Sequence, residues 1–158
     1  MRSSLAHMEQ TCSKKETGIL FAEGIIGFSE HKEYTIVPEK SKEPFLWLQA
    51  KQNADLSFII IDPKEFKPDY FPQISEADKA ALRINSVEEC RCYAIVAVPE
   101  NSDRISANLL APVFINRKEN IGRQVVLQDQ DYSVQHLIID EMLKQLEEKD
   151  ASSFAQAK

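Results

Sequence analysis

The sequence is poor in the residues from which most enzyme active-site loops are built. It contains four glycines in 158 residues and shows no P-loop, dinucleotide fingerprint, nucleophile elbow or H-E-x-x-H helix. Its 25 acidic residues offer many carboxylate pairs, but sequence spacing alone does not place any two in one pocket, as acid–base catalysis requires. We therefore predict that the protein is not an enzyme and carries no cofactor.

Long hydrophobic runs are missing too. No segment approaches the roughly 18 apolar residues of a membrane span, and the N-terminus has no apolar signal-peptide core. The three cysteines cannot all pair within one chain. These features predict a single cytoplasmic domain without membrane contact, and residues 1–8 are interpreted as a cloning remnant or an alternative start.

Metal-ligand spacing is also lacking. Cys90 and Cys92 lie two residues apart, so on a strand both side chains would face the same way. None of His7, His31 and His136 stands at a spacing that would complete the four protein ligands of structural zinc. We interpret both cysteines as packing residues and predict no metal site.

Negative charge is concentrated near the C-terminus. Residues 129–150 contain seven acidic residues and two lysines, so this segment carries −5 of the −6 net charge. Lys and Arg supply most nucleic-acid affinity, so we predict no direct nucleic-acid binding and favour a basic protein partner. The alternative is a solvated helix face that only keeps the protein soluble.

Short apolar runs dominate the rest of the chain and predict an all-β fold. Several runs are apolar on both alternating faces, which favours a small antiparallel β-barrel over a sandwich. The central feature is a hairpin in which residues 107–116 and 124–127 are joined through 117–122. The other expected strands are 17–21, 34–37, 45–50, 56–61 and 91–98.

Two helices are expected around this barrel. Ser75 is a typical N-cap for a short helix ending near Leu82. At the other end, Ile139, Met142 and Leu143 begin an amphipathic pattern that predicts a helix over 137–150. This helix either docks on its own domain or offers its apolar face to a partner. The predicted layout is a disordered 1–16, a barrel at 17–136, the helix, and a disordered tail at 151–158.

A proline-rich connection follows the fourth expected strand. Residues 62–72 contain three prolines, which exclude a central strand and indicate an extended, turning loop. Its aromatic residues Phe66, Tyr70 and Phe71 either cap the core or leave one or two rings at the surface as a partner anchor.

Five blocks of sequence resemble, in order, the FliW family of bacterial flagellar assembly factors. The most specific combination is N-L-L-A-P at 108–112 followed by D-Y-S-V at 131–134, and the likeness covers about residues 17–137. Two departures are Ala22, where the family usually has proline, and Gln135-His136-Leu137 in place of the common R-H-P. The blocks are 21–28, 60–63, 67–70, 107–116 and 131–136.

The resemblance implies a compact, non-enzymatic, barrel-like chaperone and regulator. Members bind cytoplasmic flagellin, and after flagellin export the free protein binds CsrA, a small RNA-binding translational repressor. CsrA held in this way releases the flagellin message, by an allosteric and electrostatic effect rather than by occupation of the RNA site. The rival hypothesis is a β-barrel module that binds a small molecule or nucleic acid.

Contact residues are expected among the polar positions that interrupt the motif blocks. For each of these the alternative is a structural role. For example, the Asn108 side chain would satisfy backbone groups at a strand end, and the Tyr132 ring would fold back on the barrel. The candidates are Asp62, Asp69, Tyr70, Asn108, Asp129, Asp131 and Tyr132.

Overall fold

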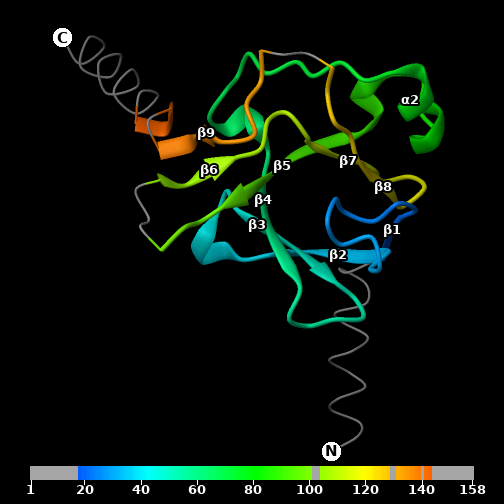
Figure 1. Ribbon diagram of the computed structural model, residues 1–158, viewed down its shortest axis with the longest axis horizontal. Helices are drawn as coiled ribbons and strands as arrows, with labels where there is room; N and C mark the ends of the chain where they lie inside the picture. The colour runs from blue at the N-terminus through cyan, green and yellow to red at the C-terminus, as the bar shows by residue number, and fades with distance from the viewer. Residues whose placement is uncertain (1–17, 101–103, 129–130, 140, 144–158) are drawn as a thin grey trace, which may run out of the picture.

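The computed structural model describes residues 18–100, 104–128, 131–139 and 141–143. Seven strands close a barrel in the order β4-β3-β2-β1-β8-β7-β5, and pairing of β5 with β4 completes the ring (Figure 1). The predicted β-barrel is therefore confirmed. Its strands are β1 (Ile19–Phe21), β2 (Glu33–Pro38), β3 (Leu46–Ala50), β4 (Ser57–Ile61), β5 (Arg91–Ala97), β7 (Val113–Asn116) and β8 (Ile121–Gln124).

One neighbouring pair in the ring is parallel. The β1–β8 pair runs in the same direction, whereas the other pairs of the ring are antiparallel. An odd number of strands cannot alternate in direction all the way round a closed ring, so one parallel pair is unavoidable. The sequence analysis predicted a purely antiparallel barrel, and the parallel β1–β8 pair corrects that prediction.

The parallel pair explains one glycine. Phe21 lies opposite Gly122 in the β1–β8 register, and a Cβ built on Gly122 would meet the Cζ atom of Phe21 at 2.4 Å. The Phe21 ring is fully buried, so it has little room to withdraw. Glycine is needed here because the ring packs directly on the backbone of β8.

The hairpin strand after β7 begins earlier than the sequence indicated. Asn116 accepts hydrogen bonds from the backbone N–H groups of Lys118 and Glu119, and Asn120 adopts a left-handed conformation with φ 55°. The turn is therefore complete by residue 120, and β8 occupies residues that we had assigned to the connection. Residues 125–127 are not part of β8, although the Val125 and Leu127 N–H groups bond to the Pro112 and Leu110 carbonyls at 3.0 and 2.8 Å.

The barrel interior is packed with side chains from several strands. Tyr34, Leu48 and Ile60 are fully buried there, and the Phe21 and Tyr34 rings meet edge to face at 5.3 Å. A ligand-binding barrel would need an apolar cavity at this position, so the packed interior argues against that rival. The buried cluster comprises Ile19, Phe21, Ile25, Tyr34, Leu48, Ala50, Ile60, Tyr93, Val113 and Ile115.

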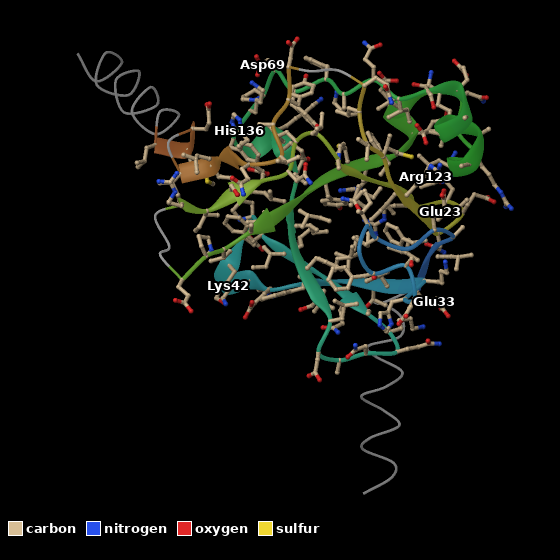
Figure 2. The ribbon with its side chains drawn as sticks, viewed as in Figure 1. Glu23, Glu33, Lys42, Asp69, Arg123 and His136 are labelled. Carbon is tan, nitrogen blue, oxygen red and sulfur yellow. The ribbon has the colours of Figure 1, made fainter. Side chains whose placement is uncertain are left out.

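The predicted short helix is confirmed as α2 (Glu76–Leu82), which lies beside β7 and β8 (Figure 1). The Ser75 hydroxyl caps it by accepting a hydrogen bond from the Asp78 N–H at 3.1 Å. Arg123 of β8 then holds the helix to the barrel. Its Nε donates to Asp78 at 2.8 Å, and its guanidinium also pairs with Glu23 of the β1–β2 connection (Figure 2).

Two short strands extend the sheet beyond the ring. The sequence predicted one strand over 107–116 and a helix from 137, but residues 108–112 belong to no strand and the helix begins at Ile138. β6 (Ser106–Ala107) pairs with β5, and β9 (His136–Leu137) pairs with β6. Residues 138, 139 and 141–143 are helical. Ile138 is fully buried and Met142 packs on the same apolar cluster, so the first turn of this helix docks on its own domain.

Some expectations lie outside the described residues. These are the termini at 1–16 and 151–158, the helical continuation beyond 143, and the candidate contact residue Asp129. Among the described residues, no helix is long and apolar enough to cross a membrane.

Candidate functional site

The proline-rich loop packs on the outer face of the barrel wall, where Phe66 and Tyr70 join a buried cluster with Ile61 of β4 and Ala94 of β5. Asp62 caps the 3-10 turn η2 (Pro63–Glu65) by accepting a hydrogen bond from the Lys64 N–H at 2.9 Å. Phe66 behind it is fully buried, and the Tyr70 N–H bonds to the Lys67 carbonyl at 3.0 Å. Proline restraint and local hydrogen bonds therefore fix this loop without a strand.

Two tyrosines join this loop to the other motif blocks. The Tyr70 hydroxyl donates to the Leu109 carbonyl at 2.7 Å, and its ring meets the Tyr132 ring edge to face at 4.7 Å. The Tyr132 hydroxyl in turn accepts a hydrogen bond from the Phe71 N–H at 3.3 Å. Three segments that are distant in sequence thus converge on one surface.

Burial separates the predicted contact residues into two groups. Tyr70 is 1% exposed, so its ring supports the surface from beneath, and direct contact between Tyr70 and a partner stays a prediction. Burial also raises the pKa of its phenol well above the ordinary value. Asn108 accepts hydrogen bonds from the Leu110 and Ala111 N–H groups at 3.2 and 2.9 Å. Its side chain therefore satisfies backbone groups, the structural role that we weighed against partner contact.

The acidic candidates remain at the surface. Asp62 and Asp131 are exposed, and the Asp69 side chain is 80% exposed while it pairs with Lys67 at 3.5 Å. Figure 2 shows Asp69 at one end of the molecule and Glu33 on the opposite side. Because Tyr132 contacts Tyr70, the chain next to Asp131 lies against the loop that carries Asp69.

Phe71 is the one aromatic ring of this loop that faces solvent. It is 64% exposed, whereas Phe66 and Tyr70 cap the core. The use of the Phe71 ring as a partner anchor stays a prediction. The Lys64 ammonium lies 4.7 Å from the Phe71 ring centroid, a cation–π contact. With its N–H bound to Tyr132, Phe71 is an exposed apolar group on a fixed backbone.

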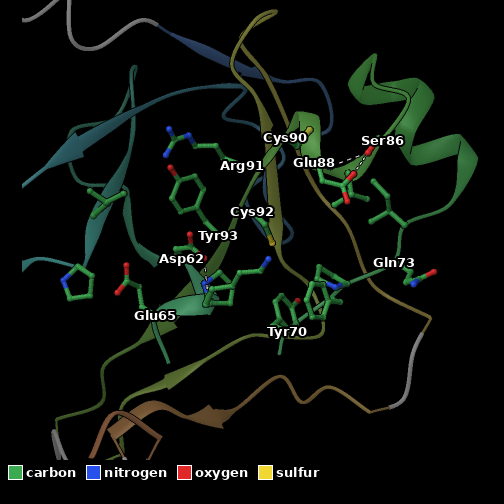
Figure 3. Close-up of a pocket in the computed structure, with 18 of the residues that line it drawn as sticks. Asp62, Glu65, Tyr70, Gln73, Ser86, Glu88, Cys90, Arg91, Cys92 and Tyr93 are labelled. Atoms are coloured by element: carbon green, nitrogen blue, oxygen red, sulfur yellow. Dashed lines mark hydrogen bonds between the residues drawn. The ribbon is translucent and has the colours of Figure 1, made fainter. Parts of the chain in front are cut away.

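Beside Phe71 runs an open groove of about 1320 Å³. It lies between the 62–74 loop, the 3-10 turn η3 (Val87–Glu89) and the first residues of β5 (Figure 3). Sequence reasoning missed this groove because its walls come together only in the fold. One signal was available: Arg91 is a charged residue at the start of an otherwise apolar strand.

Cys90 and Cys92 line this groove. Burial raises the pKa of the Cys90 thiol to about 11 and that of Cys92 to about 12. Thiols with such values are protonated and poorly reactive at neutral pH, which agrees with a packing role. Within the described part of the chain, no group of three or more His, Cys, Asp or Glu side chains is arranged to hold a metal ion.

Comparison with known proteins decides the family. The family model described as FliW protein matches residues 3–138. The chain belongs to the FliW family. Flagellar assembly factors FliW from two organisms are similar: that of Ruminiclostridium cellulolyticum is 40% identical over 140 residues, covering 88% of this chain and 95% of the relative. That of Thermoanaerobacter pseudethanolicus is 39% identical over 125 residues, covering 78% and 83%.

A more distant relative and a solved structure agree with this assignment. The Bacillus subtilis flagellar assembly factor FliW is 36% identical over 125 residues, with 79% of this chain and 87% of the relative covered. A crystal structure of the flagellar assembly factor FliW superposes with a TM-score of 0.72 at 30% identity, covering 77% of this chain and 84% of that one. FliW proteins are non-enzymatic assembly factors, as the sequence analysis predicted for this chain.

Proposed function

We propose that this FliW-family protein binds flagellin in the cytoplasm and, when free of flagellin, binds CsrA and weakens its hold on flagellin mRNA. The observation that carries the proposal is the convergence of four of the five motif blocks, all except 21–28, on one surface. Residues 62–72, 107–112 and 131–132 meet there through Tyr70 and Tyr132. Nothing in this arrangement performs chemistry, and its exposed groups suit a protein partner.

The negative charge of this surface favours a basic partner, such as an RNA-binding protein, for the flagellin-free protein. Asp62, Asp69 and Asp131 are exposed around the tyrosine pair, and the whole chain carries −6. An RNA-binding protein must present basic groups to phosphate. Acidic groups held beside such a surface lower its affinity for RNA without occupying the RNA site, and added salt weakens that effect.

Partner exchange follows if both proteins need the same loop. Phe71 and the acids near it lie on one continuous segment, 62–74, which is tied to the barrel by the bond between Tyr70 and Leu109. Asp62 and Phe71 line the same groove, so a flagellin molecule seated on Phe71 would lie beside Asp62. This geometry supports mutually exclusive binding.

A pull-down with purified proteins tests the proposal. The protein should retain flagellin and CsrA separately but not both together, and retention of neither would refute the proposed function. Reversing two surface charges, Asp69→Lys with Asp131→Lys, should reduce CsrA retention. The matched control is Asp55→Lys with Glu30→Lys, which makes the same charge change at exposed acids elsewhere and should retain CsrA normally.

A gel assay distinguishes this function from direct RNA binding. At low salt the protein alone should not shift a flagellin leader RNA, because its exposed surface is acidic near the candidate site. A shift by the protein alone would favour the nucleic-acid-binding barrel instead.

A further inference from the structure

The motif block at 21–28 takes no part in the convergence on the partner surface and forms a fixed turn instead. The Phe28 N–H bonds to the Ile25 carbonyl at 2.7 Å, and Gly27 has φ 90°, as the third residue of a type II turn does. Ile25 is 2% exposed and belongs to the barrel core, and the Phe28 ring meets the Phe58 ring edge to face at 5.2 Å. The turn is therefore anchored to the barrel.

Gln124, the last residue of β8, joins this turn to the motif block at 107–116. Its Oε1 accepts a hydrogen bond from the Ile26 N–H at 2.9 Å, and its Nε2 donates to the Ala111 carbonyl at 3.0 Å. Figure 1 shows the connection between β1 and β2 beside β8, where this bridge forms. One side chain thus links two backbone groups that are far apart in sequence.

The chemistry of the bridge selects an amide. A carboxylate accepts hydrogen bonds but does not donate them, and an ammonium donates but does not accept, whereas the amide of Gln124 does both. The Ile26 N–H can bond only to the amide oxygen, so it fixes the orientation of the amide and turns Nε2 toward Ala111. The turn therefore positions Gln124, and Gln124 positions Ala111.

Ala111 lies in the segment 108–112, which holds the parts of the partner surface together. The Leu109 carbonyl accepts the Tyr70 hydroxyl at 2.7 Å, and the Leu109 N–H bonds to the Ser133 carbonyl at 2.9 Å. One of these bonds leads to the proline-rich loop and the other to the motif block after the last barrel strand. The position of this segment therefore sets where both parts of the surface lie.

We propose that Gln124 is a positioning residue for partner binding, which transmits the fixed position of the 25–28 turn to the surface that binds CsrA and flagellin. The inference rests on the proposed function and adds how the fifth motif block takes part in it without touching a partner. A surface held in its bound shape loses less conformational freedom on association and binds more tightly. Loosening Ala111 should therefore weaken both partners, because both use this surface.

Titration calorimetry of full-length variants with purified CsrA and flagellin tests this inference. Gln124→Met keeps the length of the side chain and removes both hydrogen bonds, so it should weaken the binding of each partner by at least about threefold. Gln124→Glu keeps the acceptor but loses the donor to Ala111, so it should weaken binding at least as much. In both variants the free protein should exchange the amide hydrogens of residues 62–74 faster than wild type. Wild-type affinity for both partners in Gln124→Met would overturn the inference.

The matched control is a second glutamine that bonds to backbone carbonyls. The Gln49 Nε2 donates to the Asn53 carbonyl at 3.0 Å in the β3–β4 hairpin, where Lys51 pairs with Glu33, on the side of the molecule opposite Asp69 (Figure 2). Gln49→Met should lower the Tm by about 2–8 °C, as the test variant should, but it should keep both affinities within about twofold of wild type. Equal losses of affinity in the two variants would overturn the inference, because they would show only a response to lost stability.

A change at the other end of the bridge isolates its first hydrogen bond. Ile26 is the second residue of the turn, where proline is favoured, so Ile26→Pro removes the N–H and keeps the turn. Ile26→Ala keeps the N–H and shortens a side chain that is 61% exposed. Ile26→Pro should weaken both partners and Ile26→Ala should not, and adding Ile26→Pro to Gln124→Met should cause no further loss. A further loss in the double variant, or equal weakening by Ile26→Ala, would overturn the inference.

A measurement on the wild-type protein does not depend on the folding of a variant. Because coupling between sites is reciprocal, saturation with CsrA should slow hydrogen exchange of the Ile26 N–H. The Asp55 N–H, which bonds to the Asn53 side chain at 3.0 Å in the β3–β4 hairpin, should exchange as before. Unchanged exchange at Ile26 in the saturated complex would overturn the inference and leave the proposed function standing. A wild-type protein that binds neither flagellin nor CsrA would refute both.

Discussion

The bond from Tyr70 to Leu109 holds the proposed binding loop to the barrel, and removing one hydroxyl tests it. Tyr70→Phe keeps the ring and its packing but deletes the donor that lies 2.7 Å from the Leu109 carbonyl. The side chain is buried, so the carbonyl would lose its partner away from solvent. Such losses cost about 1–3 kcal/mol, and about 2 kcal/mol would lower the Tm of a chain of this length by about 4–8 °C.

A second tyrosine provides the control. The Tyr34 hydroxyl is also buried, but among the described residues it has no hydrogen-bond partner. Its ring contacts with Phe21 and Phe58 would survive in Tyr34→Phe. Because this change removes only an unpaired polar group, it should leave the free energy of unfolding unchanged or raise it by up to about 1 kcal/mol.

The assay is urea unfolding at pH 7, combined with hydrogen exchange of residues 62–74. Tyr70→Phe should be destabilised and should exchange faster in this loop, while Tyr34→Phe should do neither. A Tyr70→Phe variant within about 0.5 kcal/mol of wild type, or equal losses in both variants, would refute the role given to this hydrogen bond.

Alkaline pH supplies a further readout. Burial raises the folded-state pKa of Tyr70 above the unfolded value of 10.0, so the stability it contributes is present below pH 10 and is lost as pH rises further. In Tyr70→Phe the decline above pH 10 should therefore be less steep than in wild type. An identical decline would show that this phenol does not titrate differently in the folded and unfolded states.

Three other perturbations follow from single contacts. Gly122→Ala should destabilise the barrel by about 1–3 kcal/mol in thermal unfolding, because its Cβ would collide with Phe21; an unchanged Tm would contradict the close packing of β1 and β8. Asp78→Asn should cost about 1–2 kcal/mol at pH 7. Burial alone would raise the pKa of Asp78, but the hydrogen bonds from Arg123 and Ser75 outweigh it and lower the pKa. Wild type should therefore lose this contribution as pH falls below about 4, and a parallel acid profile in the variant would count against it. Burial raises the folded-state pKa of the Cys92 thiol to about 12, so the stability it contributes is present below about pH 9 and declines as pH rises toward 12; the alkaline decline should be less steep in Cys92→Ala than in wild type, and an identical decline would contradict this.

The strands and the short helix could be predicted where the local sequence carries a clear apolar pattern or a helix-capping residue. Paired strands at 45–50 and 56–61 and the Ser75 cap follow from alternation and capping chemistry, which act within a few residues. The sequence analysis expected this strand at 124–127, but β8 begins at Ile121. The tight turn before it depends on the Asn116 side-chain hydrogen bond and the left-handed Asn120, which the sequence pattern did not reveal. The β6–β9 extension was missed because a two-residue strand has no recognisable period.

The candidate site was predictable only in part for a related reason. Motif blocks identified the 62–72 loop, Asn108 and the 131–132 segment, but they did not separate surface residues from supports. Tyr70 and Asn108 form internal hydrogen bonds, which depend on neighbours about 40 residues away or on turn geometry. Phe71 became a candidate only when burial and the groove were known.

The most direct test of partner exchange is RNA release, measured by fluorescence anisotropy of a labelled flagellin leader RNA bound to CsrA. Adding this protein should lower the anisotropy, and adding flagellin afterwards should restore it, with both steps weakened at high salt. RNA that stays bound to CsrA in the presence of excess protein, or RNA release that flagellin does not reverse, would contradict the account.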